Sequence, residues 1–122
     1  MIHHKSLVKS FGYAFEGVFY ALKHNRNLRI HFIVAVAVVV ASVLAGVNTL
    51  EMGVIGIVIL LVVSSEMINA AIEQMVDLIV TEHRKEAKIA KDVAAGMVLL
   101  TSIGSVIIGI LIFVPHILKL FT

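Results

Sequence analysis

The feature that constrains this chain most is a set of three long apolar stretches. They run from Phe32 to Leu50, from Met52 to beyond Asp77, and from Val93 to Val114. A hydrocarbon core of about 30 Å needs roughly 20 apolar residues of helix to cross it. The first stretch is rich in β-branched residues, but a lone strand cannot satisfy its backbone hydrogen bonds in lipid. Each stretch is therefore expected to be a membrane-spanning helix.

Composition supports the same class of protein. Hydrophobic residues make up 60% of the 122 residues, and the mean hydropathy is +1.05. A soluble domain with a wet surface is far less apolar. We predict one all-α integral-membrane domain over residues 1–122, with spans at about 30–48, 52–80 and 93–115, the last closed by Pro115 and His116. The sequence has no cysteine, which excludes a thiolate metal site.

Residues 5–28 are predicted to form an amphipathic helix on the membrane surface. Apolar positions recur there at spacings of three and four, with charged residues between them, which is typical of a surface helix. A cleaved signal peptide would instead show a compact apolar block and a small-residue cleavage site, and neither is expected here.

The Lys and Arg residues predict the topology. Five precede the first span, none lies between the first two spans, four lie in the hydrophilic connection at 81–92, and one follows the third span. Loops rich in Lys and Arg stay in the cytoplasm. The N-terminal region and the 81–92 connection are therefore expected on the cytoplasmic side.

The second span carries a polar stripe, formed by Glu66, Asn69, Glu73 and Asp77. At about 100° per residue these side chains fall within an arc of roughly 80°, and they extend along about 16 Å of helix. An ionised carboxylate facing lipid costs several kcal/mol, so the polar stripe must face protein, water or a cation. Polar residues can also serve as contacts between helices, but three carboxylates exceed what packing requires.

The third span begins close to two further charged residues, Lys91 and Asp92, which return to the same face of the membrane as the polar stripe. Carboxylate oxygens are the ligands that Mg²⁺ prefers, and Mg²⁺ keeps some waters that phosphate can replace. The acids and the nearby basic connection therefore predict a site for Mg²⁺ and phosphate. By themselves, Lys91 and Asp92 would be a solvated helix start with Asp92 as N-cap.

At these residues the sequence resembles a known family. The stretch "EMINAAIEQMVD", which starts at Glu66, and the later "AKDVAAG", which starts at Ala90, are similar to the signature of bacterial integral-membrane diacylglycerol and undecaprenol kinases. The resemblance covers nearly the whole chain, and "RNLRIH" from Arg26 to His31 is similar to the Gram-positive undecaprenol kinase branch. It implies a homotrimer in the bacterial plasma membrane that transfers the γ-phosphoryl group of MgATP to a lipid alcohol.

The resemblance also implies roles for single residues. Glu66 matches the catalytic base, Glu73 a metal ligand on the nucleotide side, and Asn69 and Asp77 supporting positions. The remaining nucleotide contacts would be Tyr13, Glu82, Lys91 and Asp92. On sequence alone, Tyr13 would be an interfacial anchor. The chain contains neither a P-loop nor the Gly-rich motif of soluble kinases, so the membrane surface itself would have to bind ATP.

One position departs from the family pattern. The family commonly has a second metal-binding Glu just before the first span, where this chain reads "HNRN" with Asn25. An amide oxygen can coordinate Mg²⁺ but adds no negative charge, so Asn25 would be a weaker ligand. Glu16 is the alternative source of an acid.

The sequence thus predicts an ATP-dependent and Mg²⁺-dependent lipid kinase. Undecaprenol is the preferred acceptor, diacylglycerol is the alternative, and no nucleic-acid partner is expected. The rival of a different class is a small oligomeric transporter, in which an acid of the polar stripe binds a proton or a cation. A transporter would need its key acid near the midplane, whereas these acids extend toward the basic side.

Overall fold

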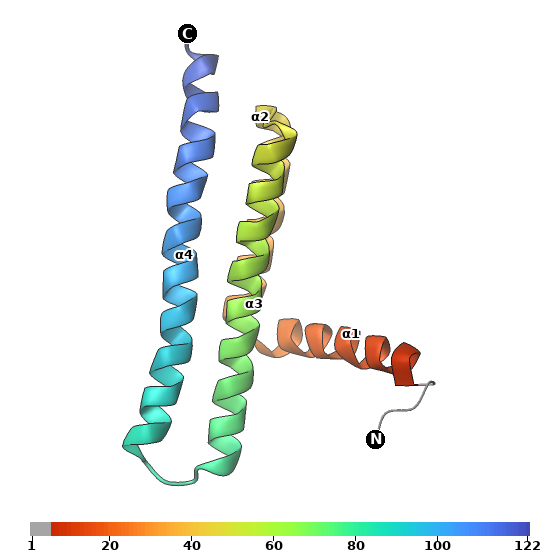
Figure 1. Ribbon diagram of the computed structural model, residues 1–122, viewed down its shortest axis with the longest axis vertical. Helices are drawn as coiled ribbons and strands as arrows, with labels where there is room; N and C mark the ends of the chain where they lie inside the picture. The colour runs from red at the N-terminus through yellow and green to blue at the C-terminus, as the bar shows by residue number, and fades with distance from the viewer. Residues whose placement is uncertain (1–5) are drawn as a thin grey trace.

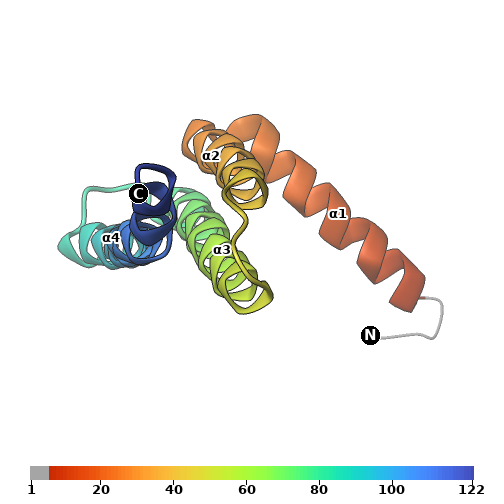
Figure 2. The same cartoon turned by 90° about the horizontal axis from the view of Figure 1, so that it is seen from above.

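A computed structural model describes residues 6–122 of the chain. The described part consists of four helices with no strand, in the order α1 (Ser6–His24), α2 (Arg26–Ala45), α3 (Thr49–Ile79) and α4 (Lys85–Leu120). Figure 1 shows α3 and α4 along the long axis with α2 behind α3, Figure 2 shows from above that α2 lies beside α3, and α1 extends sideways from the bundle in both views. The predicted all-α class is confirmed.

Three of these helices are long and apolar enough to cross a membrane: α2 with 20 residues, α3 with 31 and α4 with 36. At 1.5 Å per residue they measure about 30, 46 and 54 Å. Since the hydrocarbon core is about 30 Å thick, α3 and α4 must continue into the polar region. They do so at the end of the bundle near α1, where Figure 1 shows both helices passing beyond the level of α1.

The bounds of α4 correct the sequence prediction. The helix begins at Lys85 with Arg84 at its N-cap, so Asp92 is an internal residue and not an N-cap. The connection between α3 and α4 is therefore only residues 80–84. The polar segment 85–92 is helical because it is continuous with the apolar part of α4 that follows it. The helix also passes through Pro115, where it was expected to end. A proline costs one backbone hydrogen bond, and membrane helices tolerate that loss.

The corner between α1 and α2 lies a few residues earlier in the chain than the predicted bounds of 5–28 and 30–48 place it. The surface helix ends at His24, and Asn25 alone is extended, with φ −120° and ψ 107°, before α2 begins. The Arg29 Nη1 atom donates hydrogen bonds to the carbonyls of Leu22 at 2.9 Å and Lys23 at 2.6 Å. These carbonyls would otherwise lack partners at the end of α1. Arg29 thereby fixes the direction in which α1 leaves the bundle. The predicted start of the surface helix, at residue 5, lies outside the described residues.

The opposite end of the bundle holds the turn between α2 and α3. Gly46 adopts the left-handed conformation with φ 72°, which favours glycine after a helix end. The Asn48 side chain then accepts a hydrogen bond from the Glu51 N–H at 2.8 Å, and the Glu51 carboxylate accepts one from the Asn48 N–H at 3.0 Å. This capping box starts α3.

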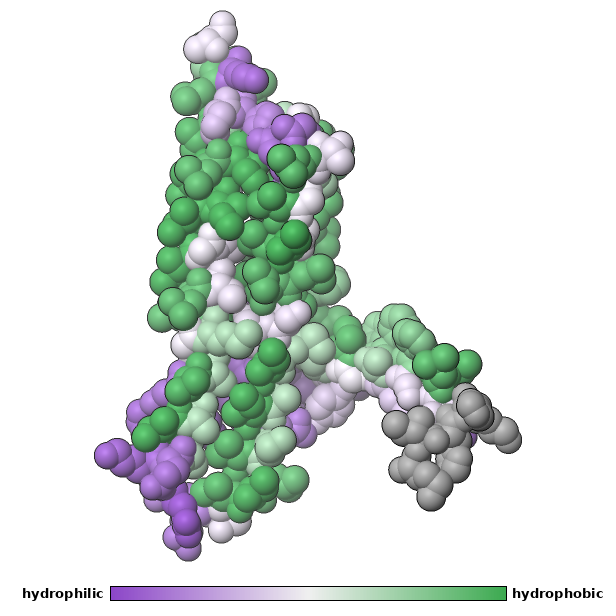
Figure 3. Space-filling view, in the orientation of Figure 1, coloured by the Kyte–Doolittle hydropathy of each residue, from purple (hydrophilic) through white to green (hydrophobic). Residues whose placement is uncertain are grey.

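Helix α3 lies between α2 and α4, and it packs mainly against α4 (Figures 1 and 2). Few apolar side chains are buried within the described chain: Leu28, Ile55, Val62, Ala94 and Ile112. Most apolar surface is therefore exposed, and it forms the hydrophobic band over the spans in Figure 3. Such a surface suits contact with lipid or with further copies of the chain.

Helix α1 has the properties of a helix at the membrane surface. None of its residues is buried, and its large aromatic side chains are mostly exposed, for example Phe11, Phe15 and Phe19. In Figure 3 its hydrophobic side chains gather on the upper side of α1, which is the side of the hydrophobic band, and more polar side chains lie on the lower side. This is the arrangement of an interfacial amphipathic helix.

Candidate functional site

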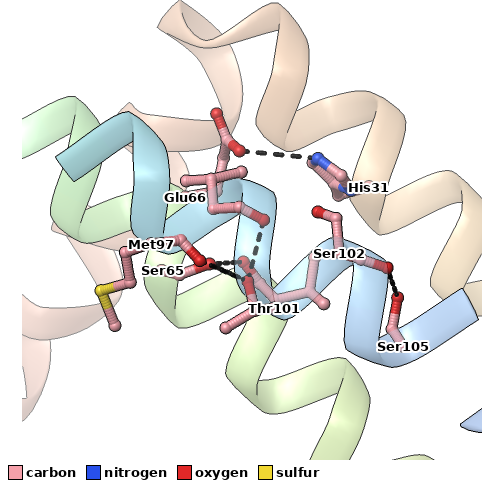
Figure 4. Close-up of polar contacts among 9 residues, drawn as sticks. His31, Ser65, Glu66, Met97, Thr101, Ser102 and Ser105 are labelled. Carbon is pink, nitrogen blue, oxygen red and sulfur yellow. Dashed lines mark hydrogen bonds and ion pairs between the residues drawn. The ribbon is translucent and has the colours of Figure 1, made fainter. Parts of the chain in front are cut away.

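Glu66 occupies a buried position at the centre of the helical bundle. It is 2% exposed, and its Oε2 lies 3.5 Å from Nε2 of His31 on α2 (Figure 4). The preceding residue, Ser65, is fully buried, and its hydroxyl lies 2.9 Å from the Thr101 hydroxyl on α4. Glu66 therefore contacts α2, while the adjacent Ser65 contacts α4. At this level the polar stripe faces protein, as the cost of exposing a carboxylate to lipid requires.

Asn69 adds an unpaired acceptor about one turn further along α3. Its Oδ1 atom is buried and has no hydrogen-bond partner among the described residues. A buried polar atom without a partner costs about 1–3 kcal/mol, and such atoms are normally satisfied by a ligand, a water or another chain. The Asn69 Oδ1 atom near Glu66 can therefore accept a hydrogen bond from a ligand, a water or another chain.

The far end of the polar stripe contacts the start of α4. Lys91 Nζ donates a hydrogen bond to Asp77 Oδ1 at 2.5 Å and so links α3 to α4. Lys88 Nζ donates to Asp92 Oδ2 at 2.6 Å within α4. Both pairs lie outside the buried part of the bundle. Asp92 is therefore engaged by its own helix, whereas Lys91 faces the polar stripe.

A groove of about 670 Å³ surrounds Lys91 where α3 passes into α4. We name it the basic groove after its charged lining residues, which are Asp77, Glu82, Arg84, Lys85, Lys88 and Lys91. Cations outnumber acids in this set, so the basic groove attracts anions. The predicted residues Asp77, Glu82 and Lys91 thus meet in one place.

Glu73 lies between the buried carboxylate and the basic groove. It is exposed, and it is close enough to Lys91 to interact with it electrostatically. Within residues 6–122 no group of three or more His, Asp and Glu side chains is placed to hold a metal ion. Mg²⁺ commonly takes only one or two protein carboxylates and completes its shell with water and phosphate. The exposed Glu73 fits that use, but a single chain does not enclose a cation.

Asn25 lines a different groove, which we name the corner groove. It has a volume of about 360 Å³ and lies between α1 and α3, with Asn25 on one side and Ala70 and Gln74 on the other. Ala70 and Gln74 therefore lie at the level of α1. Glu66 lies about one turn before Ala70, and Asp77 lies about one turn beyond Gln74, toward the basic groove. Asn25 makes no side-chain cap bond to α2.

Tyr13 is not brought to the other predicted residues of the same chain. Its side chain is largely exposed on α1, and both Figure 1 and Figure 2 show α1 running away from α4. Glu66 and Asp77 are likewise about 16 Å apart along α3. The predicted set therefore divides into a buried centre at Glu66, the basic groove, the corner groove and the exposed Tyr13.

His31 is the residue that sequence reasoning missed. The six histidines show no ligand spacing, and His31 lies inside a polar cluster that precedes an apolar run. The sequence feature that could have indicated a role for His31 was its position at the start of the predicted first span. The pairing of α2 with α3, which is a tertiary feature, is what brings His31 to Glu66.

Comparison with known proteins identifies related sequences. Residues 12–113 match the family model of prokaryotic diacylglycerol kinase. A diacylglycerol kinase of Synechocystis sp. (strain ATCC 27184 / PCC 6803 / Kazusa) is 43% identical over 116 residues, which cover 94% of this chain and 66% of the relative. An undecaprenol kinase of Bacillus subtilis (strain 168) is 40% identical over 107 residues, which cover 88% of this chain and 87% of the relative.

Proposed function

The chain belongs to the prokaryotic diacylglycerol kinase family, and we propose that it transfers the γ-phosphoryl group of MgATP to the hydroxyl of undecaprenol. Membership of a family of lipid kinases sets aside the transporter alternative. The observation that carries the proposal is the burial of Glu66, a carboxylate that is 2% exposed and lies about one turn from the level of α1, the helix that would rest on the membrane surface. There it can meet a hydroxyl group whose hydrocarbon tail stays in the bilayer.

A second groove supports a lipid acceptor. It has a volume of about 260 Å³, lies between α2, α3 and α4, and is lined mainly by aliphatic residues such as Val34, Ile59 and Val62. We name it the apolar groove. One of its polar lining residues is His31, which contacts Glu66. An isoprenoid tail along the apolar groove would bring its hydroxyl end toward the carboxylate.

The basic groove supports the nucleotide role. Phosphoryl transfer depends mainly on alignment of the reacting groups and on neutralisation of phosphate charge. Lys91 and its basic neighbours would bind the phosphates, with Glu82 in the same groove. Glu73 would hold Mg²⁺, which supplies further charge neutralisation, and Asn25 would be an uncharged second ligand. Tyr13 and Asp92 would complete the nucleotide contacts, and Asn69 and Asp77 would support the acids.

The reaction follows from this arrangement. The hydroxyl oxygen of the lipid attacks the γ-phosphorus in line with the departing oxygen, and ADP leaves with the electron pair of the broken P–O bond. The hydroxyl O–H bond breaks, and its proton passes to Glu66. General-base assistance of this kind is worth about 10² to 10⁴ in rate.

We also propose a homotrimer with sites shared between chains. Helix α1 carries Tyr13 away from the basic groove of its own chain, so Tyr13 would contact a nucleotide at the basic groove of a neighbouring chain. The unpartnered Asn69 Oδ1 atom and the exposed apolar faces of the spans would also be completed by a neighbouring chain. The charge distribution supports a plasma-membrane orientation with the N-terminus and the 81–92 segment in the cytoplasm.

The acceptor can be tested directly. The chain spans 87% of the undecaprenol kinase relative and 66% of the diacylglycerol kinase relative, at 40% and 43% identity, so the choice between the two alcohols is one for experiment. Purified protein in mixed micelles should be assayed with labelled ATP and each alcohol in turn. We expect a higher kcat/KM with undecaprenol, whereas a higher value with diacylglycerol would assign the alternative reaction.

A further inference from the structure

The buried carboxylate of Glu66 has one ionisable partner in the described chain. His31 Nε2 lies 3.5 Å from Glu66 Oε2, and the two side chains are 28% and 3% exposed. An ionised carboxylate is costly to bury unless a cation or a hydrogen-bond donor compensates it. The environment of Glu66 therefore depends on what His31 provides.

Within residues 6–122, His31 is the ionisable side chain that forms an ion pair with Glu66. Helix α4 has no ionisable side chain between Val93 and Pro115, where it packs on this part of α3. On α2, the Arg29 guanidinium is held by carbonyls at the end of α1. On α1, the His24 ring contacts the Tyr20 carbonyl at 3.0 Å. The next acid on α3, Glu73, is exposed about two turns away.

We propose that His31 is a positioning residue that holds the Glu66 carboxylate oriented toward the acceptor hydroxyl. The inference rests on the proposed kinase function for its catalytic meaning. An ionised Glu66 can accept the hydroxyl proton, whereas a protonated one cannot. His31 also lines the apolar groove, so it fixes the carboxylate at the place where the lipid hydroxyl would arrive.

The pair itself can be tested without measuring activity. Thermal unfolding in detergent should be compared for the wild-type protein, His31→Leu, Glu66→Gln and the double variant. We expect His31→Leu to lower the Tm, because it leaves a buried carboxylate without a partner, and Glu66→Gln to recover most of that loss in the double variant. His24→Leu, on the exposed side of α1, is the matched control. Additive effects of the two substitutions would overturn the pairing.

The catalytic role requires a pH profile. His31→Leu removes the polar partner of a buried carboxylate, so its effect on catalysis should depend on pH. We expect His31→Leu to lower kcat about tenfold at pH 7, with a smaller loss at pH 9 and little change in the KM for MgATP. His31→Gln keeps an N–H donor, so its kcat should lie between the values of the wild-type protein and His31→Leu. An equal loss at every pH, or no loss, would overturn the positioning role.

The two experiments separate this inference from the proposed function. If the wild-type protein phosphorylates neither lipid alcohol, the proposed function fails and so does the catalytic role of His31. The unfolding comparison still decides whether His31 and Glu66 form a pair. If the wild-type protein is active and Glu66→Gln is not, the pH profile of the His31 variants alone decides the positioning role.

Discussion

Glu66 and Glu73 lie about two turns apart on α3, but their surroundings differ. Glu66 is buried among three helices and meets a histidine, whereas Glu73 is exposed and interacts electrostatically with Lys91. A buried carboxylate suits proton transfer at a lipid hydroxyl, and an exposed one suits a hydrated cation. The different surroundings therefore favour different chemical roles for two residues of the same type.

Replacing Glu66 tests the first of these roles. Glu66→Gln keeps the shape of the side chain but cannot accept the hydroxyl proton, so we expect kcat to fall by about 10² to 10⁴. The KM for ATP and the elution volume in detergent should remain near their wild-type values. The matched control is Glu86→Gln on the exposed start of α4. Near-normal turnover of Glu66→Gln would refute the assignment.

Replacing Asn25 tests the second role. Asn25→Glu adds a carboxylate in the corner groove without loss of a cap bond, because the Asn25 side chain makes none. We expect the variant to reach half-maximal activity at a lower Mg²⁺ concentration, while Glu73→Gln should lose most activity at any accessible Mg²⁺ concentration. Asn27→Glu, which adds the same charge nearby, is the control. An unchanged Mg²⁺ dependence of Asn25→Glu would point to another acid, such as Glu16.

At the scale of elements, the helices were predictable and some of their ends were not. Long apolar runs have few options in lipid, so the spanning helices follow from composition and length. The segment from Lys85 to Asp92 is polar enough to resemble a loop, but it is helical in the structure. The contact of His31 with Glu66 was not predictable, because it depends on which face of α2 meets α3.

The link between α3 and α4 allows a test of Lys91. Its contact with Asp77 is largely exposed, and such pairs contribute only about 0.2–1 kcal/mol to stability. A charged hydrogen bond to phosphate is worth about 1.5–3 kcal/mol. Lys91→Ala should therefore raise the KM for ATP about tenfold to a hundredfold with little change in Tm. Lys119→Ala, at the opposite end of α4, is the control.

A charge exchange separates the two functions of Lys91. The double variant Asp77→Lys, Lys91→Asp restores an ion pair between α3 and α4 but removes the cation from its place on α4. If Lys91 binds phosphate, the exchange should not restore the KM for ATP. Full recovery of activity in the exchanged variant would mean that Lys91 acts only by joining the helices.

At the scale of the whole molecule, the single chain leaves both surface and chemistry incomplete. Large apolar side chains are exposed along all three spanning helices, and the Asn69 Oδ1 atom has no partner within the described chain. Glu66 is buried, while Lys91 contacts the polar stripe about 16 Å further along α3. Contacts between copies would cover part of the apolar surface and would let Glu66 of one chain and Lys91 of another line one site, with the triphosphate of the nucleotide spanning the distance between them.

Mixed oligomers test this sharing of sites. Glu66→Gln and Lys91→Ala should each be nearly inactive alone, because every site then lacks one of the two residues. In a trimer with random mixing, half of the chains retain Glu66 and the other half retain Lys91, so about a quarter of the shared sites are intact. Coexpression with different affinity tags and purification through both tags removes the trimers that contain one variant only. Each remaining mixed trimer has one intact shared site out of three, so it should show about a third of the wild-type activity. If mixed oligomers form but remain inactive, both residues belong to the same chain's site, and a functional monomer in detergent would exclude sharing altogether.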